Sequence, residues 1–394
     1  MSDLMHRIQQ AAAASAPLVQ QWRRHIHAHP ELSFNEVNTQ AYVMQQLQSI
    51  GITDMQTVAH TGVVALIKGL NPDSRIVALR GDMDALPITE RNDVSYKSVN
   101  EGVMHACGHD VHTACLLGAA KILFDLRHEW EGTVKLLFQP GEEKLPGGAS
   151  MMIAEGALKN PEPGQIFGQH VMPLLPAGTV GFRSGLYMAS TDELYVKIIG
   201  KGGHGAMPHL NIDPVATAAQ IIVALQQIVS RKANPITPSV LSFGKVIAEG
   251  ATNVIPNEVY MEGTFRTLDE EWRNQAHKAM VATATSIAEG MGARCEFEIR
   301  KGYPFLKNDA KATAHAKQAA VEYLGSDNVV DLDIWMAAED FAYYSQVMPA
   351  CFYRLGTRNE ALGITSSVHT STFDIDESAL PIGAGLMAWI AIKN

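Results

Sequence analysis

The sequence predicts an α/β protein in which an inserted domain of ferredoxin-like βαββαβ order interrupts an α/β core. Short apolar runs alternate with helical periodicity on both sides of the insertion, which is typical of a sheet covered by helices. Metal-type side chains follow these runs, as expected at the carboxyl ends of strands in an open α/β sheet. Between residues 187 and 302 the pattern changes to alternating strands and amphipathic helices.

The length of the chain supports two domains. At 394 residues it exceeds the usual size of a single domain. We expect a catalytic domain in two parts, 1–186 and 303–394, on either side of the insertion at 187–302. The core is then discontinuous in sequence.

The elements of the first part follow from periodicity and turn signals. Helical patterns occupy 16–28, 36–50 and 112–127. Continuous apolar runs, typical of buried strands, occupy 76–79, 133–138 and 165–171. The first run leads into GDMDALP, which places Asp82 and Asp84 just past a strand end.

The insertion shows its order clearly. Strand patterns occupy 191–200, 239–248, 258–266 and 294–300, and helical patterns occupy 213–231 and 269–290. Leu194, Val196 and Ile198 lie on one face of the first strand, and we expect them in the core. The order βαββαβ is the signature of a ferredoxin-like unit.

Composition and charge narrow the functional classes. A formal net charge of −10 argues against nucleic acid as a partner, because phosphate binding needs a basic surface. No apolar run reaches the roughly 20 residues that span a bilayer, so we expect no membrane association. The N-terminus lacks the basic start and apolar run of a signal peptide. We therefore expect a cytoplasmic protein, in which cysteines stay reduced.

The segment HACGHD at 105–110 is the strongest functional signal. It places Cys107 and His109 two residues apart, on a glycine-containing turn before a helical pattern. Thiolate and imidazole are ligands that suit zinc and neighbouring metals. A lone histidine or cysteine is more often a core residue, but the proximity of the two favours a metal site.

A pair of adjacent carboxylates follows the strand at 133–138. Glu142 and Glu143 lie in the segment QPGEEK. In one site two such charges repel and raise one pKa, whereas a solvated loop pair has no special role. A cation removes the conflict for the carboxylate that binds it, and the other can act as general base for an activated water. The pair therefore indicates hydrolysis rather than binding alone.

Four further polar residues are weaker candidates. His170 ends the apolar run at 165–171, and His369 lies in a polar, turn-rich segment. In the insertion, His204 lies in the loop GKGGHGAMPH and Asn253 in EGATNVIPNE. Glycines allow close approach of a ligand, although a plain hairpin turn explains the first loop equally well.

The remaining histidines near these segments are expected to support the ligands rather than bind metal. The i, i+2 spacing of His25, His27 and His29 does not bring their side chains together on a helix. His105 and His112 flank the HACGHD metal motif, and we expect structural roles for both.

In combination, these segments resemble the aminoacylase/carboxypeptidase family of two-metal hydrolases. Within it, the chain is similar to the amidohydrolase branch of hippurate hydrolase and the plant auxin-conjugate hydrolases. The matching segments run in order from residue 29 to residue 380: HPELSFNE, RGDMDALP, MHACGHDVHTA, QPGEE, GQHV, GKGGHGAMPH, TNVIP, AEDFAYY and VHTSTFDIDESAL. Two departures, KLPGGAS after the carboxylates and Arg354 in CFYRLG, bear on substrate choice rather than on the proposed ligands.

The resemblance implies a zinc-peptidase-like α/β core with a lid and dimerisation domain. It implies that two divalent cations (Zn, Mn, Co or Ni) are held by Cys107, His109, Glu143, His170 and His369. Cys107 occupies the place of a metal-bridging aspartate in sister branches. Glu142 is implied as the general base and Asp84 as a carboxylate that orients its neighbours. His204 and Asn253 match lid positions that reach the substrate from the partner subunit in dimeric relatives.

We therefore expect a metal-dependent amidohydrolase that cleaves N-acyl-L-amino acids, hippurate-like, N-acetyl or other, into a carboxylic acid and an amino acid. Two metals about 3.5–4 Å apart would activate one water, Glu142 would relay its proton, His204 would stabilise the oxyanion, and Asn253 would hold the carboxylate of the substrate. The alternatives are a metallo-dipeptidase or carboxypeptidase of the same fold, a non-catalytic metal-dependent binding protein, and a single-zinc redox or structural protein built on Cys107 and His109. The preferred acyl group stays open among benzoyl, acetyl, indolylacetyl and fatty acyl.

Overall fold

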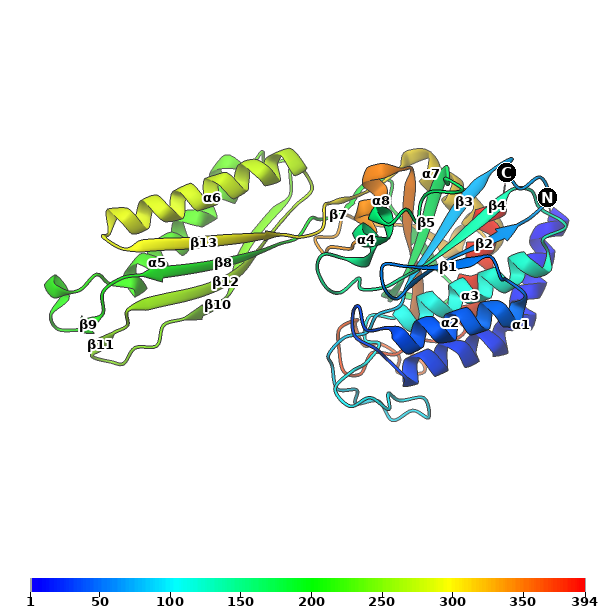
Figure 1. Cartoon of the computed structure of the whole chain (residues 1–394), viewed down its shortest axis with the longest axis horizontal. Helices are drawn as coiled ribbons and strands as arrows, with labels where there is room; N and C mark the ends of the chain where they lie inside the picture. The colour runs from blue at the N-terminus through cyan, green and yellow to red at the C-terminus, as the bar shows by residue number, and fades with distance from the viewer. Residues whose placement is uncertain (1, 394) are drawn as a thin grey trace. The chain divides into compact units, whose positions relative to one another are not determined.

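The computed structural model describes residues 2–393, which divide into two compact units (Figure 1). The larger unit comprises the chain up to Tyr187, Lys307–Ile334 and the chain from Asp340 onward. The smaller unit comprises Met188–Leu306 and Trp335–Glu339. A lid or dimerisation role for the smaller unit stays a prediction.

A mixed eight-stranded sheet forms the centre of the larger unit. Its order is β1 (Met55–Val58), β2 (Gly62–Lys68), β4 (Thr133–Gln139), β3 (Ile76–Asp82), β5 (Gln165–Pro176), β16 (Ala350–Arg358), β6 (Val180–Phe182) and β15 (Val329–Asp331). Strands β4, β3, β5 and β16 run parallel to one another, whereas β2 and β6 flank them antiparallel. The carboxyl ends of the parallel strands share one edge, so the side chains that follow them gather there.

Helices cover both faces of this sheet. They are α1 (Ser2–Ala28), α2 (Val37–Ile50), α3 (His109–Asp125), α4 (Gly148–Ala154), α7 (Ala310–Leu324), α8 (Ala342–Val347) and α9 (Ala379–Ile392). Helix α3 packs against α1, α9 and β3, whereas α4 packs against α8 and β4. Phe167 of β5 joins the core that includes α3 and α9, and a Cβ at the adjacent Gly168 would touch Phe341 at 2.7 Å. Successive residues of β5 therefore point to opposite helical layers.

Two helices begin earlier than the periodicity predicts. Helix α3 begins at His109 rather than at 112, so this histidine lies in the first turn. Helix α1 begins at Ser2 rather than at 16. In the first half of this helix Ile8 and Ala12 are buried, as is Val19 in the second half. Alanine makes this face of the helix weakly apolar, which hides the pattern in the sequence.

The smaller unit has the predicted βαββαβ order. It comprises β8 (Asp192–Ile199), α5 (Pro214–Gln227), β10 (Ser239–Ile247), β12 (Glu258–Thr267), α6 (Glu270–Gly290) and β13 (Arg294–Lys301). The sheet order β10-β12-β8-β13 is antiparallel throughout and ferredoxin-like. Leu194, Val196 and Ile198 are buried in its core, as predicted.

The remaining elements are short. They are β7 (Gly185–Met188), β9 (Gly203–His204), a 3-10 turn (Pro208–Leu210), a π-helical turn (Ile228–Lys232), β11 (Val254–Ile255), β14 (Leu306–Asn308) and a 3-10 turn (Ser326–Asn328). Strand β9 pairs with β11, and β7 pairs with β14. The π-helical turn ends the predicted helix 213–231.

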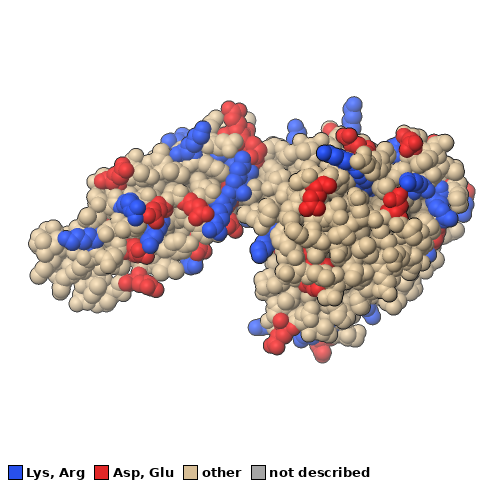
Figure 2. Space-filling model, viewed as in Figure 1, with Lys and Arg blue, Asp and Glu red and all other residues tan. Residues whose placement is uncertain are grey.

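On the face that Figure 2 shows, basic and acidic side chains are interspersed rather than gathered into one patch of a single sign. Among the helices of residues 2–393, none is long and apolar enough to cross a membrane.

A buried carboxylate joins β8 to α6 in the smaller unit. Asp192 accepts hydrogen bonds from Arg273 Nε at 3.0 Å and Nη2 at 2.6 Å, and His277 Nε2 lies 2.6 Å from it. Burial alone would raise the pKa of Asp192, but the bonds from His277 and Arg273 outweigh it and lower the pKa. The carboxylate therefore stays charged and fastens the helix to the start of the sheet.

We expect Asp192→Asn to destabilise the smaller unit by about 3 kcal/mol, because the buried Arg273 charge loses the partner that holds two of its nitrogens. In the unsubstituted protein this stabilisation is complete above the ordinary aspartate pKa of about 4 and is lost as the pH falls through the lower pKa of the folded state. Native-state hydrogen exchange of amides in β8 and α6 measures both effects. The control Glu262→Gln, which removes an exposed pair with Lys245, should leave exchange nearly unchanged. Equal effects of the two substitutions would contradict the role of Asp192.

Candidate metal centre

The larger unit brings together all the ligands that the resemblance implies, although four separate segments supply them. Cys107 lies in the turn before α3, His109 is the first residue of α3, and Glu143 lies in the loop after β4. His170 lies in β5, and His369 lies in the loop before α9. Glu143 follows the carboxyl end of β4 and His109 begins α3, where such a sheet gathers ligands, whereas His170 lies within β5.

The potential ligand atoms form overlapping groups. Within each group they lie within 4.8 Å of one another, and the groups are Cys107/His109/His170, Cys107/Glu143/His369 and His109/Glu142/Glu143. The Cys107 Sγ atom lies 3.5 Å from His170 Nε2 and 3.3 Å from His369 Nε2. Two groups of three therefore share one thiol, which suits two cations with a common sulfur ligand.

Hydrogen bonds fix the tautomers of two histidines. His170 Nδ1 donates to the Val171 carbonyl oxygen at 2.8 Å, and His109 Nδ1 lies 3.1 Å from Asp84 Oδ1. In a neutral ring each contact leaves Nε2 with its lone pair, which is how protein histidines are prepared to bind metal. Burial alone would lower the pKa of His109, but Asp82 and Asp84 raise it well above its ordinary value, so a bound cation would displace a proton from this ring. Burial lowers the pKa of His170 well below its ordinary value, so the ring stays neutral.

The residues present fit a cation. His109 Nε2 is buried and has no hydrogen-bond partner, an arrangement that is unfavourable unless the atom binds another group. Burial and the nearby Glu143 carboxylate raise the pKa of the Cys107 thiol, whereas coordination would deprotonate it. A donor set of sulfur, imidazole and carboxylate suits zinc, manganese, cobalt or nickel.

His369 has an unusual backbone. Its φ is +61°, in the left-handed region that side chains disfavour. Its main-chain N–H donates to the Ala106 carbonyl oxygen at 2.7 Å, and its Nε2 lies 3.2 Å from Glu143 Oε1. Hydrogen bonds to Cys107 and Glu143 raise the pKa of His369 to about 10, so these groups favour positive charge at this point. Strain at a residue with such partners is typical of a functional site.

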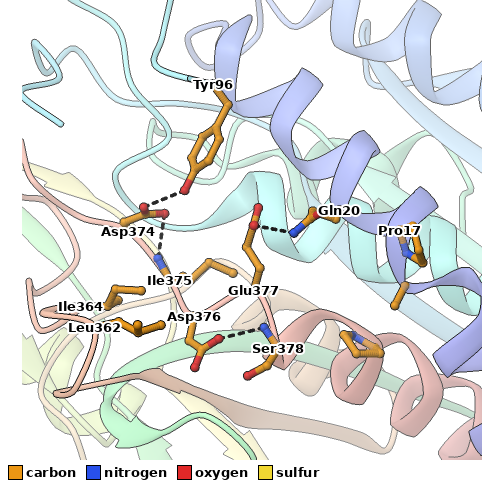
Figure 3. Close-up of a pocket in the computed structure, with 12 residues that line it drawn as sticks. Pro17, Gln20, Tyr96, Leu362, Ile364, Asp374, Ile375, Asp376, Glu377 and Ser378 are labelled. Carbon is orange, nitrogen blue, oxygen red and sulfur yellow. Dashed lines mark hydrogen bonds between the residues drawn. The ribbon is translucent and has the colours of Figure 1, made fainter. Parts of the chain in front are cut away.

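The segment after His369 is fastened to α1 by a buried guanidinium. Arg23 donates to Asp110 at 2.7 Å and to Asp374 at 2.9 Å, and thereby joins the start of α3 to this segment. Tyr96 also donates to Asp374 (Figure 3). Both residues line a cavity of about 530 Å³. Asp110 therefore serves as an ion-pair partner of Arg23 beside the predicted ligand His109.

Asp84 connects two ligand-bearing segments. It is buried, and its Oδ1 faces the His109 ring. Its Oδ2 accepts the Glu143 main-chain N–H at 2.9 Å and the Ser33 hydroxyl at 2.6 Å. This geometry fits a residue that orients its neighbours.

His112 and His105 lie near the predicted ligands but outside the groups that contain Cys107. His112 Nδ1 lies 2.6 Å from Asp82 Oδ1, and its Nε2 accepts the Val171 main-chain N–H at 2.9 Å. His105 is fully buried, which lowers its pKa to about 3. His27 faces Asp110 at 2.8 Å. These contacts agree with the supporting roles that we expected.

Glu142 is buried and lies beside the ligands without belonging to either group that shares Cys107. The Asp340 main-chain N–H lies 3.4 Å from Glu142 Oε1. Glu36 accepts the Gly141 N–H, and Asp340 accepts the Ala149 N–H, on either side of Glu142. Both residues lie in segments that resemble the family, AEDFAYY and HPELSFNE. Local sequence patterns do not reveal these contacts, because the partners are far apart in the chain.

His204 and Asn253 lie in the smaller unit, in the ribbon of β9 and β11. The Gly205 N–H donates to the Asn253 carbonyl oxygen at 2.8 Å. The side chains of His204 and Asn253 are both exposed. His204 Nδ1 accepts the Ala206 N–H at 3.1 Å, so Nε2 carries the proton and is a donor. A Cβ at Gly202 would lie 2.4 Å from the Ile255 carbonyl oxygen, so this close pairing needs glycine. Their roles stay predictions.

Comparison with known proteins identifies the family. A family model described as peptidase family M20/M25/M40 matches residues 78–393. An N-acyl-L-amino acid amidohydrolase of Geobacillus stearothermophilus is 45% identical over 75% of this chain and 79% of its own. An IAA-amino acid hydrolase of Arabidopsis thaliana is 40% identical over 94% and 85%.

Two further relatives bear on chemistry. Thermostable carboxypeptidase 2 of Saccharolobus solfataricus is 38% identical over 99% of both chains. The crystal structure of a dinuclear metal-binding peptidase of the M20 family from Bacillus subtilis matches 96% of this chain and 98% of its own, with a TM-score of 0.82 and 37% identity. The chain belongs to peptidase family M20/M25/M40, as a metal-dependent amidohydrolase with residues suited to two metal ions.

Proposed function

We propose that Glu142 is the general base of this amidohydrolase and that five side chains hold its two cations. The proposed ligands are Cys107, His109, Glu143, His170 and His369. The observation that supports this assignment is the thiol of Cys107, which belongs to two groups of three ligand atoms while Glu142 lies beside both. A carboxylate that lies next to a dinuclear site without serving as a metal ligand is what hydrolysis by activated water requires.

Bound cations would act as Lewis acids and lower the pKa of a water. Glu142 accepts a proton from the water whose oxygen attacks the amide carbon of an N-acyl-L-amino acid. The same carboxyl then gives this proton to the leaving nitrogen as the C–N bond breaks. The products are a carboxylic acid and a free amino acid, and Glu142 returns to its starting state.

The smaller unit contributes the substrate contacts in this proposal. The exposed Nε2–H of His204 donates to the carbonyl oxygen as its negative charge develops, where a fixed donor contributes most. The Asn253 amide holds the amino-acid carboxylate. These side chains lie on and beside the short strands β9 and β11, which pair with each other antiparallel.

We propose a homodimer formed through the smaller unit. The edge strand β10 exposes Val246, and helix α5 exposes Val215 and Val223. An apolar helix face beside an unpaired strand edge favours pairing with a second copy. In such a dimer His204 acts on the site of its partner.

The donor set accepts several metals, and its thiol suits a reducing compartment. We propose zinc or manganese, with cobalt and nickel as possible substitutes, because cellular supply decides among metals for such a set. A cytoplasmic location keeps the Cys107 thiol reduced, and its three fellow cysteines are also free.

A second candidate function is a carboxypeptidase or dipeptidase, which the carboxypeptidase relative favours. Both activities break an amide bond next to a carboxylate and use the same site. A non-catalytic binding protein does not need Glu142, and a single-zinc protein on Cys107 and His109 leaves the second ligand group without a use.

Glu142→Gln should retain both cations and lose turnover by about 10²–10⁴-fold, because the amide cannot accept the proton. Glu143→Gln should instead lose metal. Metal content by mass spectrometry, with hydrolysis of hippurate, N-acetyl amino acids and dipeptides by manganese- or zinc-loaded enzyme, measures both. Near-normal turnover of Glu142→Gln would refute its role, and faster cleavage of dipeptides than of N-acyl amino acids would favour the second candidate.

Cys107→Ala should lower the metal content below two per chain, because both ligand groups lose a member. Cys115→Ala is the matched control, since Cys115 lies in the helix that follows Cys107 and is also buried, with its Sγ facing the Leu380 carbonyl oxygen at 3.6 Å. Metal analysis after dialysis checks both variants. A Cys107→Ala protein that keeps its full metal content would make this cysteine structural only.

Mixing His204→Ala with Glu142→Gln subunits should restore activity. Each variant alone forms an inactive dimer, but a mixed dimer contains one site with an intact Glu142 and an intact His204 from the partner. Random exchange should recover about a quarter of the activity, because half of the dimers are mixed and one site in each works. Sedimentation verifies the dimer, and mixtures that stay inactive would refute the shared site.

A further inference from the structure

The main chain just before Glu142 is held by a carboxylate from a distant part of the sequence. Glu36 Oε1 accepts the Gly141 N–H at 2.8 Å. The Glu36 side chain is fully buried, at 0% exposure. A buried carboxylate is unfavourable unless it is bonded, so its partners indicate what it stabilises.

Glu36 does not serve its own helix. It occupies the N-cap position of α2, yet its side chain makes no capping hydrogen bond. An acidic side chain there usually accepts the free N–H groups of the first turn. Instead, Oε1 also accepts the Phe34 N–H at 2.9 Å, and Oε2 accepts the Thr61 hydroxyl at 2.6 Å. The carboxylate thus joins three segments that meet at the loop carrying Glu142.

Close packing against Phe34 also restricts the main chain at Gly141. Gly141 has a φ of +55°, and a Cβ there would lie 2.2 Å from the Phe34 ring. Phe34 itself has a φ of +67°, which side chains disfavour. The hydrogen bond from Gly141 to Glu36 and the packing against Phe34 therefore define one position for the main chain before the proposed base.

We propose that Glu36 is a positioning residue of the reaction, which holds Gly141 so that the Glu142 carboxylate stays directed at the attacking water. The proposal rests on the role of Glu142 as base. The Glu142 side chain is held separately, by the Asp340 N–H at 3.4 Å. Release of Gly141 shifts the carboxylate relative to its neighbours, and a misplacement of about 1 Å can cost about 100-fold in rate.

The test compares Glu36→Leu with Glu36→Gln. Leucine has a similar size but no acceptor, so kcat should fall by about 10–100-fold, with KM changed by less than about threefold and the metal content retained. Glutamine can keep its oxygen on both main-chain N–H groups while its nitrogen donates to the Thr61 hydroxyl, so it should restore kcat to near normal. Normal kcat in the leucine variant, or an equal fall in both, would overturn the proposal.

Glu31→Leu is the control for a general disturbance of this segment. Glu31 also accepts hydrogen bonds near the start of α2, from the Asn38 and Thr39 N–H groups, at 3.2 and 2.8 Å. The loop at Gly141 is not among these partners. Thermal melting of each variant separates folding from catalysis. A fall in kcat as large as that of Glu36→Leu would overturn the proposal.

A double substitution separates this proposal from the proposed function. In the Glu142→Gln background, adding Glu36→Leu should leave the residual kcat unchanged within about twofold, because the group that Glu36 positions is already absent. A further large fall would show that Glu36 acts elsewhere and would overturn the proposal. Near-normal turnover of Glu142→Gln alone would refute the base itself, and the single variant reveals this.

Discussion

Buried carboxylates that bond main-chain and ring groups hold the site in one arrangement, and the rest of its chemistry depends on them. Asp84 is the clearest example, since it bonds the His109 ring, the Glu143 N–H and the Ser33 hydroxyl. These bonds connect the start of α3, the loop after β4 and the segment before α2, which share no strand pairing. Because an unbonded buried charge is strongly unfavourable, each carboxylate selects a single arrangement of the segments that it joins.

This constraint explains how the potential metal-binding atoms can be held close to one another in a fixed arrangement. His109 and His170 are held by their Nδ1 atoms, and the thiol of Cys107 lies near Nε2 of His170 and of His369. The ligand atoms therefore do not have to be ordered when a cation binds, which reduces the entropy lost on binding. The same rigidity serves the role proposed for Glu142, because a general base works only within hydrogen-bond reach of the proton that it accepts.

The sequence predicts what local patterns encode. The strands ending near Asp82 and Gln139 and the βαββαβ order follow from periodicity, and the motif of Cys107 and His109 predicts a metal site. What it cannot predict is pairing between distant polar groups, such as Glu36 with Gly141. The local sequence around His369 is a weak signal for metal binding. The fold strengthens it, because it places His369 beside Cys107. Alanine in α1 conceals an apolar face that packing makes evident.

The central claim is that the Cys107 thiolate would be a ligand of both cations and Glu142 a ligand of neither. X-ray absorption spectroscopy of enzyme loaded with two zinc ions per chain tests it most directly. The account predicts a sulfur neighbour at about 2.3 Å in the average zinc shell and a metal–metal vector of about 3.5–4 Å, both lost in Cys107→Ala. A spectrum with only nitrogen and oxygen neighbours and no metal–metal vector would contradict it.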